Sequence, residues 1–250
     1  MKKRLHIIMP MGGEGSRFKS VGIDTPKPLI KANGVSFFER ALRSISNYIS
    51  DYELTCIVRS EHVKQYHIDE EIQKVHKANI ITIEKTTRGA VETVMLAKNF
   101  INDNDTVLIM DCDLEFISNE YINEIKKVLN NTSIYDGLVL SFESSDPRYS
   151  YAAVDGNDIV IKTAEKIVIS NHALIGAYFF SNGKIFKEIA QSMLSDADKC
   201  LKNVKELYTS LLYNKYIDLG KKIKLYHKYM YNSFGTPEEL KDYEENCNNN

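Results

Sequence analysis

The sequence lacks the features that mark several large classes of protein. No segment approaches the roughly 18 consecutive apolar residues that a membrane-spanning helix needs. The four cysteines are scattered and form no C-x-x-C pair, which argues against a disulfide framework or a zinc site and favours reduced, cytoplasmic thiols. The net charge is only −2, so no basic field attracts nucleic acid or an anionic membrane.

No stretch of the sequence suggests a boundary between domains. We find no linker-like composition, no internal repeat and no low-complexity segment. A chain of 250 residues with 43% apolar content can bury a large core without disulfides or metals. We therefore expect one domain that spans residues 1–250.

A glycine-rich loop follows the first apolar run of the chain. Residues 5–9 are apolar and typical of a buried strand, which Pro10 interrupts. The loop then contains three closely spaced glycines: Gly12, Gly13 and Gly15. Glycines reach positive φ and let backbone N–H groups approach a ligand, and successive N–H groups in such a turn bind phosphate.

Two cations come after this loop. Arg17 follows it directly, and Lys27 lies between Pro26 and Pro28, which fix the local backbone. The spacing fits neither Walker A nor the dinucleotide-binding fingerprint, because no Gly-Lys-Ser/Thr occurs and Phe18 stands where the third glycine would be. An ordinary glycine-rich turn is the alternative. The two positive charges favour the triphosphate site of a nucleotide-using enzyme.

Apolar strands and helical periods alternate in the first half of the chain. Strands are expected over residues 54–58, 80–83 and 106–110, and helices over 36–48, 61–75, 90–100 and after Ser118. This order is typical of an α/β fold with a doubly wound, mainly parallel sheet and helices on both faces. Ligands bind beyond the carboxyl ends of such strands.

The second half of the chain is richer in strands. We expect strands over residues 137–142, 149–154, 158–162, 173–180 and 222–226, and helices over 185–194 and 204–219. A last helix should begin at Pro237, with Thr236 as its N-cap. We expect the later strands to carry the binding site for a second substrate.

A pair of acidic residues ends the buried strand at 106–110. Asp111 and Asp113 lie where the predicted sheet would bind ligands. Mg²⁺ prefers oxygen ligands and is usually held by one or two carboxylates together with substrate phosphates. A solvated turn is the alternative, since aspartate is common in turns. The position favours a magnesium site.

Several motifs resemble those of the sugar-nucleotide pyrophosphorylases, the nucleotidyltransferases that activate sugar phosphates. The sequence Gly-Glu-Gly-Ser-Arg at 13–17 and Pro-Lys-Pro at 26–28 are similar to the family signature. Further similar segments lie at residues 89–93, 111–113, 150–152, 165–166, 175–178 and 235–238. The resemblance spans nearly the whole chain.

The resemblance implies both a fold and a reaction. The fold would be Rossmann-like and GT-A-like, with a nucleotide-binding half over about residues 1–133 and an acceptor-binding half over about 134–247. The enzyme would move a nucleoside monophosphate from an NTP to a small phosphate monoester and release pyrophosphate. Its partners would be these substrates rather than nucleic acid or a membrane, and a homo-oligomer is one option for its assembly.

The matched motifs also imply a role for individual residues. Three would be catalytic: Arg17, Lys27 and Asp113. The nucleotide would be bound by Met11, Gly12, Gly13, Gly15, Ser16, Arg17, Thr87, Gly89 and Ala90. The acceptor would be bound by Tyr151, Glu165, Lys166 and Tyr178. The cofactor would be Mg²⁺, held by Asp113 and Asp111.

Two departures from the family pattern leave the substrates open. Ser233 replaces the aspartate that usually precedes Gly-Thr-Pro as a second metal ligand, and the usual glutamine near residues 86–88 is absent. The chain is most similar to enzymes of bacterial capsule clusters, which favours CTP as donor and phosphoglutamine as the specific acceptor hypothesis. UTP, dTTP or GTP with a sugar 1-phosphate, a metal-dependent glycosyltransferase and a non-catalytic nucleotide-binding regulator are the alternatives.

Other polar residues are assigned structural roles or left open. His6 in the first strand is expected to be packed and hydrogen-bonded. Arg148 and Tyr149 are expected in a turn rather than at the acceptor. His172 either contacts the acceptor site or packs inside the protein.

Overall fold

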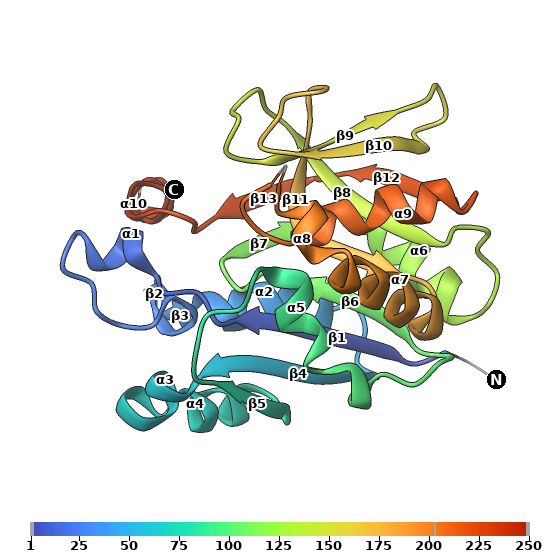
Figure 1. Ribbon diagram of the computed structural model, residues 1–250. Helices are drawn as coiled ribbons and strands as arrows, with labels where there is room; N and C mark the ends of the chain where they lie inside the picture. The colour runs from blue at the N-terminus through green and yellow to red at the C-terminus, as the bar shows by residue number, and fades with distance from the viewer. Residues whose placement is uncertain (1–2, 203, 249–250) are drawn as a thin grey trace.

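A mixed sheet of nine strands forms the centre of the molecule. The computed structural model describes residues 3–202 and 204–248, which Figure 1 shows as ribbons. The strands of the central sheet are β1 (Leu5–Met11), β4 (Tyr52–Arg59), β5 (Asn79–Ile83), β6 (Thr106–Met110), β8 (Gly137–Glu143), β9 (Ser150–Val154), β10 (Val160–Glu165), β11 (His172–Phe180) and β12 (Ile223–His227). Their order is β10-β9-β11-β6-β1-β4-β5, with β8 paired to β11 and β12 paired to β8.

The direction of the strands changes across the sheet. Strands β6, β1, β4 and β5 are parallel, as the alternation of strands and helices predicts. Strand β11 runs antiparallel to β6, β8 and β9, while β12 is parallel to β8. The predicted doubly wound α/β sheet is confirmed, and its antiparallel pairs are concentrated around β11.

Helices cover both faces of the sheet. The chain also forms α1 (Ser16–Lys19), α2 (Phe37–Ser46), α3 (Ser60–Tyr66), α4 (Ile68–Val75), α5 (Ala90–Met95), α6 (Asn119–Leu129), α7 (Gly183–Ser195), α8 (Ala197–Cys200), α9 (Leu212–Asp218) and α10 (Pro237–Asn248). Helices α2 and α6 bury their apolar sides against one face, and α5, α7 and α9 cover the other (Figure 1). Successive side chains of β1 point to opposite faces of the sheet. Met9 packs in the core under α2 and α6, and Ile8 packs in the core under α5, α7 and α9.

A smaller apolar cluster joins the two ends of the chain. Phe18 of α1 and Phe37 of α2 pack with Phe234, whose ring stacks on Phe37 with centroids 4.8 Å apart. Strand β13 (Met230–Ser233) pairs with β7 (Leu114–Ile117), which comes directly after Asp113. Figure 1 shows α10 beside α1 as a result. The C-terminal segment therefore lies against the glycine-rich loop region.

Several predicted elements have different bounds. The helix expected over 61–75 is divided at His67, which has φ 50°. The helix expected over 204–219 begins only with the 3-10 turn η3 (Thr209–Leu211) and α9, because Leu207 forms backbone hydrogen bonds with Arg88 and Val91. The helix expected over 90–100 ends at Met95 and is followed by the 3-10 turn η2 (Lys98–Phe100). The β7–β13 pair was not predicted.

Two short elements complete the fold. The strands β2 (Lys31–Ala32) and β3 (Val35–Ser36) form a hairpin, and the 3-10 turn η1 (Lys27–Leu29) contains the predicted Lys27 frame. Within the described ranges 3–202 and 204–248, the structure contains no helix whose length and apolar character would suit a membrane span.

Candidate active site

Three segments that are distant in the sequence meet at the carboxyl ends of β1 and β6. Lys27 Nζ forms an ion pair with Asp113 and donates a hydrogen bond of 3.4 Å to the Gly235 carbonyl. Arg17 Nη1 also donates to the Gly235 carbonyl, at 3.4 Å. The two predicted cations are thus placed around one backbone oxygen, next to one of the predicted metal ligands.

The Lys27 ammonium is kept charged by its surroundings. Burial lowers the pKa of Lys27, but the charge and hydrogen bond of Asp113 raise it more, so the net shift is upward. Asp111 adds to this effect. A permanently protonated lysine beside the glycine loop suits the binding of a polyanion.

Asp111 lines an open cavity together with Asp113. Protein atoms surround its carboxylate, although the open cavity leaves the side chain accessible to solvent. This burial, the charge of Asp113 and that of Glu165 raise the pKa of Asp111 to about 7, while Lys27 opposes the shift. Two carboxylates that disfavour each other's ionisation form a site that a cation would stabilise.

The position of Asp111 depends on a glycine in the neighbouring strand. The Asp111 amide donates to the Gly176 carbonyl at 2.8 Å, and the carboxylate lies directly over Gly176. A Cβ at residue 176 would be 2.1 Å from Asp111 Oδ2. Only glycine therefore leaves room for the observed side-chain position.

Two cavities adjoin at the paired carboxylates. A cavity of about 220 Å³ under the loop is lined by Met11, Gly13, Gly15, Lys27, Asp111 and Asp113, among others. A larger cavity of about 290 Å³ extends toward the later strands and is lined in part by Arg17, Ala90, Glu165, Lys166 and Tyr178. Asp111 and Asp113 line both, so they stand between the predicted nucleotide side and the predicted acceptor side.

The acceptor side presents the half-buried carboxylate of Glu165 and the exposed ammonium of Lys166. Glu165 accepts hydrogen bonds from Ser150 and, at 2.9 Å, from Ser210. Burial raises the pKa of Glu165 despite these bonds. Lys166, with φ 57°, extends from the end of β10 and donates to the Tyr208 hydroxyl at 2.7 Å.

The remaining predicted nucleotide residues line neither of these two cavities. The Gly12 carbonyl accepts from Arg59 at 3.4 Å, and a Cβ at Gly12 would lie 2.5 Å from Ile83. Thr87 donates its hydroxyl to the Gly89 carbonyl at 3.0 Å. Gly89 has φ 140° and packs on the Leu207 backbone, and Ser16 begins α1. Their predicted contacts with a nucleotide remain predictions.

The prediction that Tyr151 lines the acceptor site is wrong. Its side chain is completely buried, and its hydroxyl donates to the Asp146 carbonyl at 2.7 Å. Successive side chains of β9 point to opposite sides, so Ser150 faces the cavity and Tyr151 faces the core. Tyr149 lies in the predicted turn before β9, and it also lines the cavity.

Sequence reasoning missed several further residues of the cavity wall, among them Arg148, Glu239 and Tyr208. Arg148 lines the cavity and pairs with Glu239 at 2.9 Å. Glu239 in turn accepts from the Gly235 amide at 2.7 Å and the Thr236 amide at 3.2 Å. The Thr-x-x-Glu spacing of a helix capping box could have located Glu239. No sequence signal pointed to Tyr208, which lay in a segment predicted to be helical.

The two histidines singled out by the sequence lie outside the cavity walls. His6 is buried, and its Nε2 is 2.8 Å from the Thr55 hydroxyl, which confirms the structural role expected for it. His172 packs against the His227 ring with centroids 5.5 Å apart. Of the two alternatives for His172, the structure therefore favours packing inside the protein over a contact with the acceptor.

Comparisons with known proteins agree with this arrangement. A sequence model described as nucleotidyl transferase matches residues 5–241. The chain is 28% identical over 230 residues to the D-glycero-alpha-D-manno-heptose 1-phosphate guanylyltransferase of Campylobacter jejuni, covering 89% of this chain and 98% of that protein. It is 22% identical over 170 residues to the 2-C-methyl-D-erythritol 4-phosphate cytidylyltransferase of Fusobacterium nucleatum, covering 66% and 68%.

A solved structure shows the same architecture over nearly the full length. The nucleoside-diphosphate-sugar pyrophosphorylase of Vibrio cholerae superposes with a TM-score of 0.80 at 26% identity, covering 96% of this chain and 99% of that one. The family match includes both the glycine-rich loop and the Gly-Thr-Pro-Glu segment. The chain therefore belongs to the nucleotidyl transferase family and is an enzyme of the nucleotidyltransferase (EC 2.7.7) type.

Proposed function

We propose that the enzyme transfers a nucleoside monophosphate from an NTP to a small phosphate monoester and releases pyrophosphate. The NTP that we favour is CTP, so the transferred group would be CMP. One observation carries the proposal: two cationic groups lie on opposite sides of a carboxylate pair. Lys27 lines the cavity under the loop, and Lys166 lines the larger cavity, which Arg17 also borders. This arrangement suits two phosphate-bearing substrates that meet above Asp111 and Asp113.

The proposed reaction needs no general base. An oxygen of the acceptor phosphate, already anionic at neutral pH, attacks the α-phosphorus of the NTP in line. The new P–O bond forms as the bond between the α-phosphorus and the bridging oxygen breaks, and pyrophosphate leaves with both electrons of that bond. Alignment and charge neutralisation then supply most of the catalysis. Arg17 would neutralise the leaving phosphates, Lys27 would bridge toward the α-phosphate, and Lys166 would hold the acceptor phosphate.

Mg²⁺ is the cofactor that the carboxylate pair would fit. Asp111 and Asp113 line the same cavities, and burial together with the charge of Asp113 raises the pKa of Asp111, so a bound cation would favour its ionised form. In the part of the chain that the structure describes, no three His, Cys, Asp or Glu side chains gather into a ligand set. Phosphate and water oxygens would have to complete the coordination, as is usual for Mg²⁺. Bound there, the ion would stabilise charge on the phosphates.

Ser233 offers no replacement for the missing acidic ligand. Its hydroxyl donates to Glu239 at 2.7 Å, and that Glu239 oxygen also accepts backbone N–H groups at the start of α10. Because Glu239 already accepts these hydrogen bonds, we do not assign it to the metal. Asp111 is the second carboxylate that we assign to the metal.

The choice of CTP and phosphoglutamine rests on the sequence. It is supported by the similarity to capsule-cluster enzymes and by a cytidylyltransferase among the relatives. The product would be a precursor for surface polysaccharide, made in the cytoplasm by one domain with a nucleotide half (about 1–133) and an acceptor half (about 134–247). A second candidate is a sugar 1-phosphate with GTP, UTP or dTTP, which the heptose 1-phosphate guanylyltransferase relative favours.

A substrate matrix tests both candidates. The protein is incubated with Mg²⁺, each of CTP, UTP, dTTP, GTP and ATP, and a panel of phosphate monoesters that includes phosphoglutamine, phosphocholine and sugar 1-phosphates. Pyrophosphate is followed, and the nucleotide product is identified by mass. We expect pyrophosphate only when an acceptor is present, with CTP as the best donor.

The alternative activities give different products. A glycosyltransferase would use a nucleotide sugar and release no pyrophosphate. A simple NTPase would release inorganic phosphate without an acceptor. NTP binding without pyrophosphate from any pair would overturn the proposed transfer and favour a nucleotide-binding regulator.

A further inference from the structure

Tyr208 lines the larger cavity beside Lys166, and its hydroxyl contacts that lysine directly. We propose that Tyr208 is a positioning residue of the transfer reaction: its hydroxyl holds the Lys166 ammonium where the phosphate of the acceptor binds. This inference rests on the proposed function, because it concerns the acceptor side of the same site.

Two contacts join the tyrosine to the lysine. Lys166 Nζ donates to the Tyr208 hydroxyl at 2.7 Å and lies 4.9 Å from the centroid of the Tyr208 ring. An ammonium has three N–H donors, so this bond leaves two for phosphate oxygens. The contact can therefore persist when an acceptor binds.

The segment that carries Tyr208 is fixed on both sides of it. We call residues 204–211 the strap. The Leu207 amide donates to the Arg88 carbonyl at 2.9 Å, and the Leu207 carbonyl accepts from the Val91 amide at 3.0 Å. On the other side, the Ser210 hydroxyl donates to Glu165 at 2.9 Å. The strap therefore bridges the predicted nucleotide segment and β10, and it presents the Tyr208 hydroxyl at a defined place.

A neutral hydrogen-bond partner suits a phosphate-binding lysine such as Lys166 better than an acidic partner. The charges of Glu165 and Glu206 both act on the Lys166 ammonium, and a lysine has a long, flexible side chain. Pairing with either carboxylate would neutralise the charge that an acceptor phosphate needs. The phenol orients the ammonium without neutralising it, and its hydrogen bond is the main cause of the raised pKa of Lys166, followed by the smaller opposing effect of burial.

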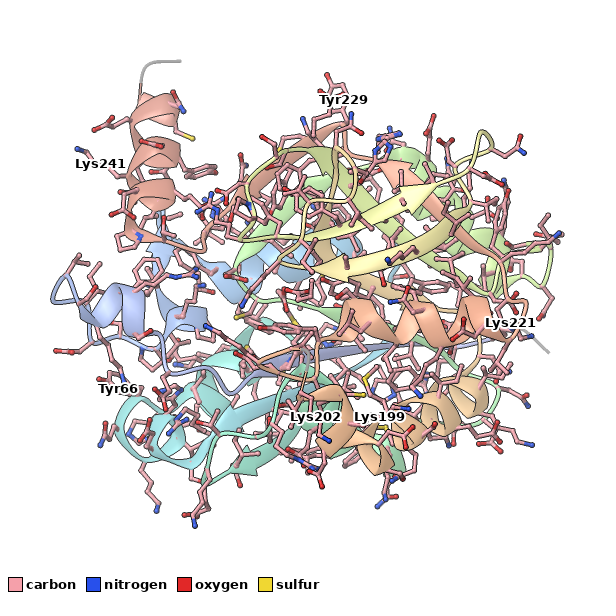
Figure 2. All side chains as sticks on the ribbon, turned by 45° about the horizontal axis from the view of Figure 1, so that its top comes forward. Tyr66, Lys199, Lys202, Lys221, Tyr229 and Lys241 are labelled. Carbon is pink, nitrogen blue, oxygen red and sulfur yellow. The ribbon has the colours of Figure 1, made fainter. Side chains whose placement is uncertain are left out.

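A kinetic comparison tests the role of the hydroxyl. Tyr208→Phe keeps the ring over Lys166 and removes only the hydroxyl. We expect the KM for the acceptor to rise about tenfold, the scale of one charge-assisted hydrogen bond. The KM for the NTP should stay within about twofold, because its binding does not depend on Lys166. Tyr229→Phe is the matched control, since Tyr229 is 84% exposed and projects from the surface in Figure 2.

A second measurement does not depend on turnover. Lysines labelled by reductive ¹³C-methylation are titrated by NMR, and the Lys166 signal is assigned by its loss in Lys166→Arg. In Tyr208→Phe we expect the pKa of Lys166 to fall, while Tyr229→Phe leaves it unchanged. If the wild type turns over no substrate pair, the proposed function fails, but this titration still tests the contact. An unchanged acceptor KM or an unmoved Lys166 signal in Tyr208→Phe would overturn the role of Tyr208.

Discussion

The Lys27 ammonium and the Asp113 carboxylate form an ion pair although 86 positions separate them in the sequence. They meet because β1 and β6 are adjacent parallel strands, whose carboxyl ends lie at one edge of the sheet. The pair joins the proposed triphosphate side to the proposed metal side. Each residue holds the other in place, so both are sensitive targets for substitution.

Removing either partner should abolish most of the transferase activity. We expect Lys27→Ala and Asp113→Ala each to lower kcat by at least about two orders of magnitude, the scale of one electrostatic group in an active site. Pyrophosphate release with the best substrate pair measures the effect. Lys31→Ala, at an exposed lysine four residues away, should retain full activity. Near wild-type turnover in either Lys27→Ala or Asp113→Ala would contradict the assignment.

A methyl group at residue 176 should displace a proposed metal ligand. The new Cβ of Gly176→Ala would stand 2.1 Å from Asp111 Oδ2, so the carboxylate must move. We expect activity to fall by about a hundredfold, as displacements of about 1 Å in active sites do, and the Mg²⁺ concentration for half-maximal activity to rise.

The matched control for this substitution is Gly156→Ala. Gly156 lies in the turn between β9 and β10, and no atom lies within 4 Å of the position of its Cβ. The control should leave both activity and the Mg²⁺ requirement unchanged. Equal behaviour of the two alanine variants would show that Asp111 need not be where the structure places it.

The start of α10 should be a source of stability that also supports the site. The Thr236 hydroxyl accepts a hydrogen bond from the Glu239 amide at 3.2 Å, and the Thr236 amide donates one to the Glu239 carboxylate at 3.2 Å. We expect Glu239→Ala to cost about 1 kcal/mol, or about 2–4 °C in Tm. Activity should fall as well, since the Gly235 carbonyl positions Arg17 and Lys27.

Glu238→Ala provides the comparison for the α10 cap. Glu238 is exposed and directly precedes Glu239, so its loss removes a charge at the same helix end without removing the cap. Thermal unfolding monitored by circular dichroism separates the two variants. A Glu239→Ala protein as stable as Glu238→Ala would argue against the capping role.

The buried His6 should make the protein less stable in mild acid. Burial lowers the pKa of His6 in the folded state, outweighing the carboxylates around it. The unfolded chain, with a histidine pKa of about 6.5, then binds the proton first as the pH falls. The stabilising contribution is complete above about pH 6.5 and declines below it, by up to about 1.4 kcal/mol per pH unit.

Urea unfolding at a series of pH values tests the His6 effect. His6→Gln removes the titrating group, so its free energy of unfolding should fall less steeply than that of the wild type between about pH 6.5 and 5.5. The pKa of His62 is also lowered by burial, so some acid sensitivity should remain in the variant. If the free energy of unfolding falls equally steeply with pH in the wild type and in His6→Gln, His6 is not a source of the acid sensitivity.

Local sequence patterns were enough to predict the parallel core. Five consecutive buried residues in β6 and the apolar run of β1 can be read without tertiary information. The starts of α6 and α2 could be predicted in the same way. The Ser118 and Ser36 hydroxyls each accept a hydrogen bond from a backbone N–H group three residues later. The residues Arg17, Lys27 and Asp113, which we propose to be catalytic, were selected through motifs because each lies in a distinctive local pattern, and the structure places them together.

Features that depend on long-range contacts were beyond such reasoning. Residues 204–208 have helical spacing, yet the hydrogen bonds of Leu207 with Arg88 and Val91 keep them out of a helix. Tyr149 and Tyr151 are equally plausible from composition, but Tyr149 lines the cavity from the turn before β9 while Tyr151 is buried in the core. Arg148 reaches the site through Glu239, 91 positions later in the numbering, which no local pattern could indicate.

The pairing of β13 with β7 has a consequence for biosynthesis. The carbonyl that accepts hydrogen bonds from Arg17 and Lys27 belongs to Gly235, so this cluster cannot form until the chain has left the ribosome through Gly235. The parallel strands β1, β4 and β6 can associate earlier, during synthesis. Nascent chains would thus hold a folded sheet before the cluster is complete, and a stop codon upstream of β13 would leave a protein that folds in part and has no enzyme activity.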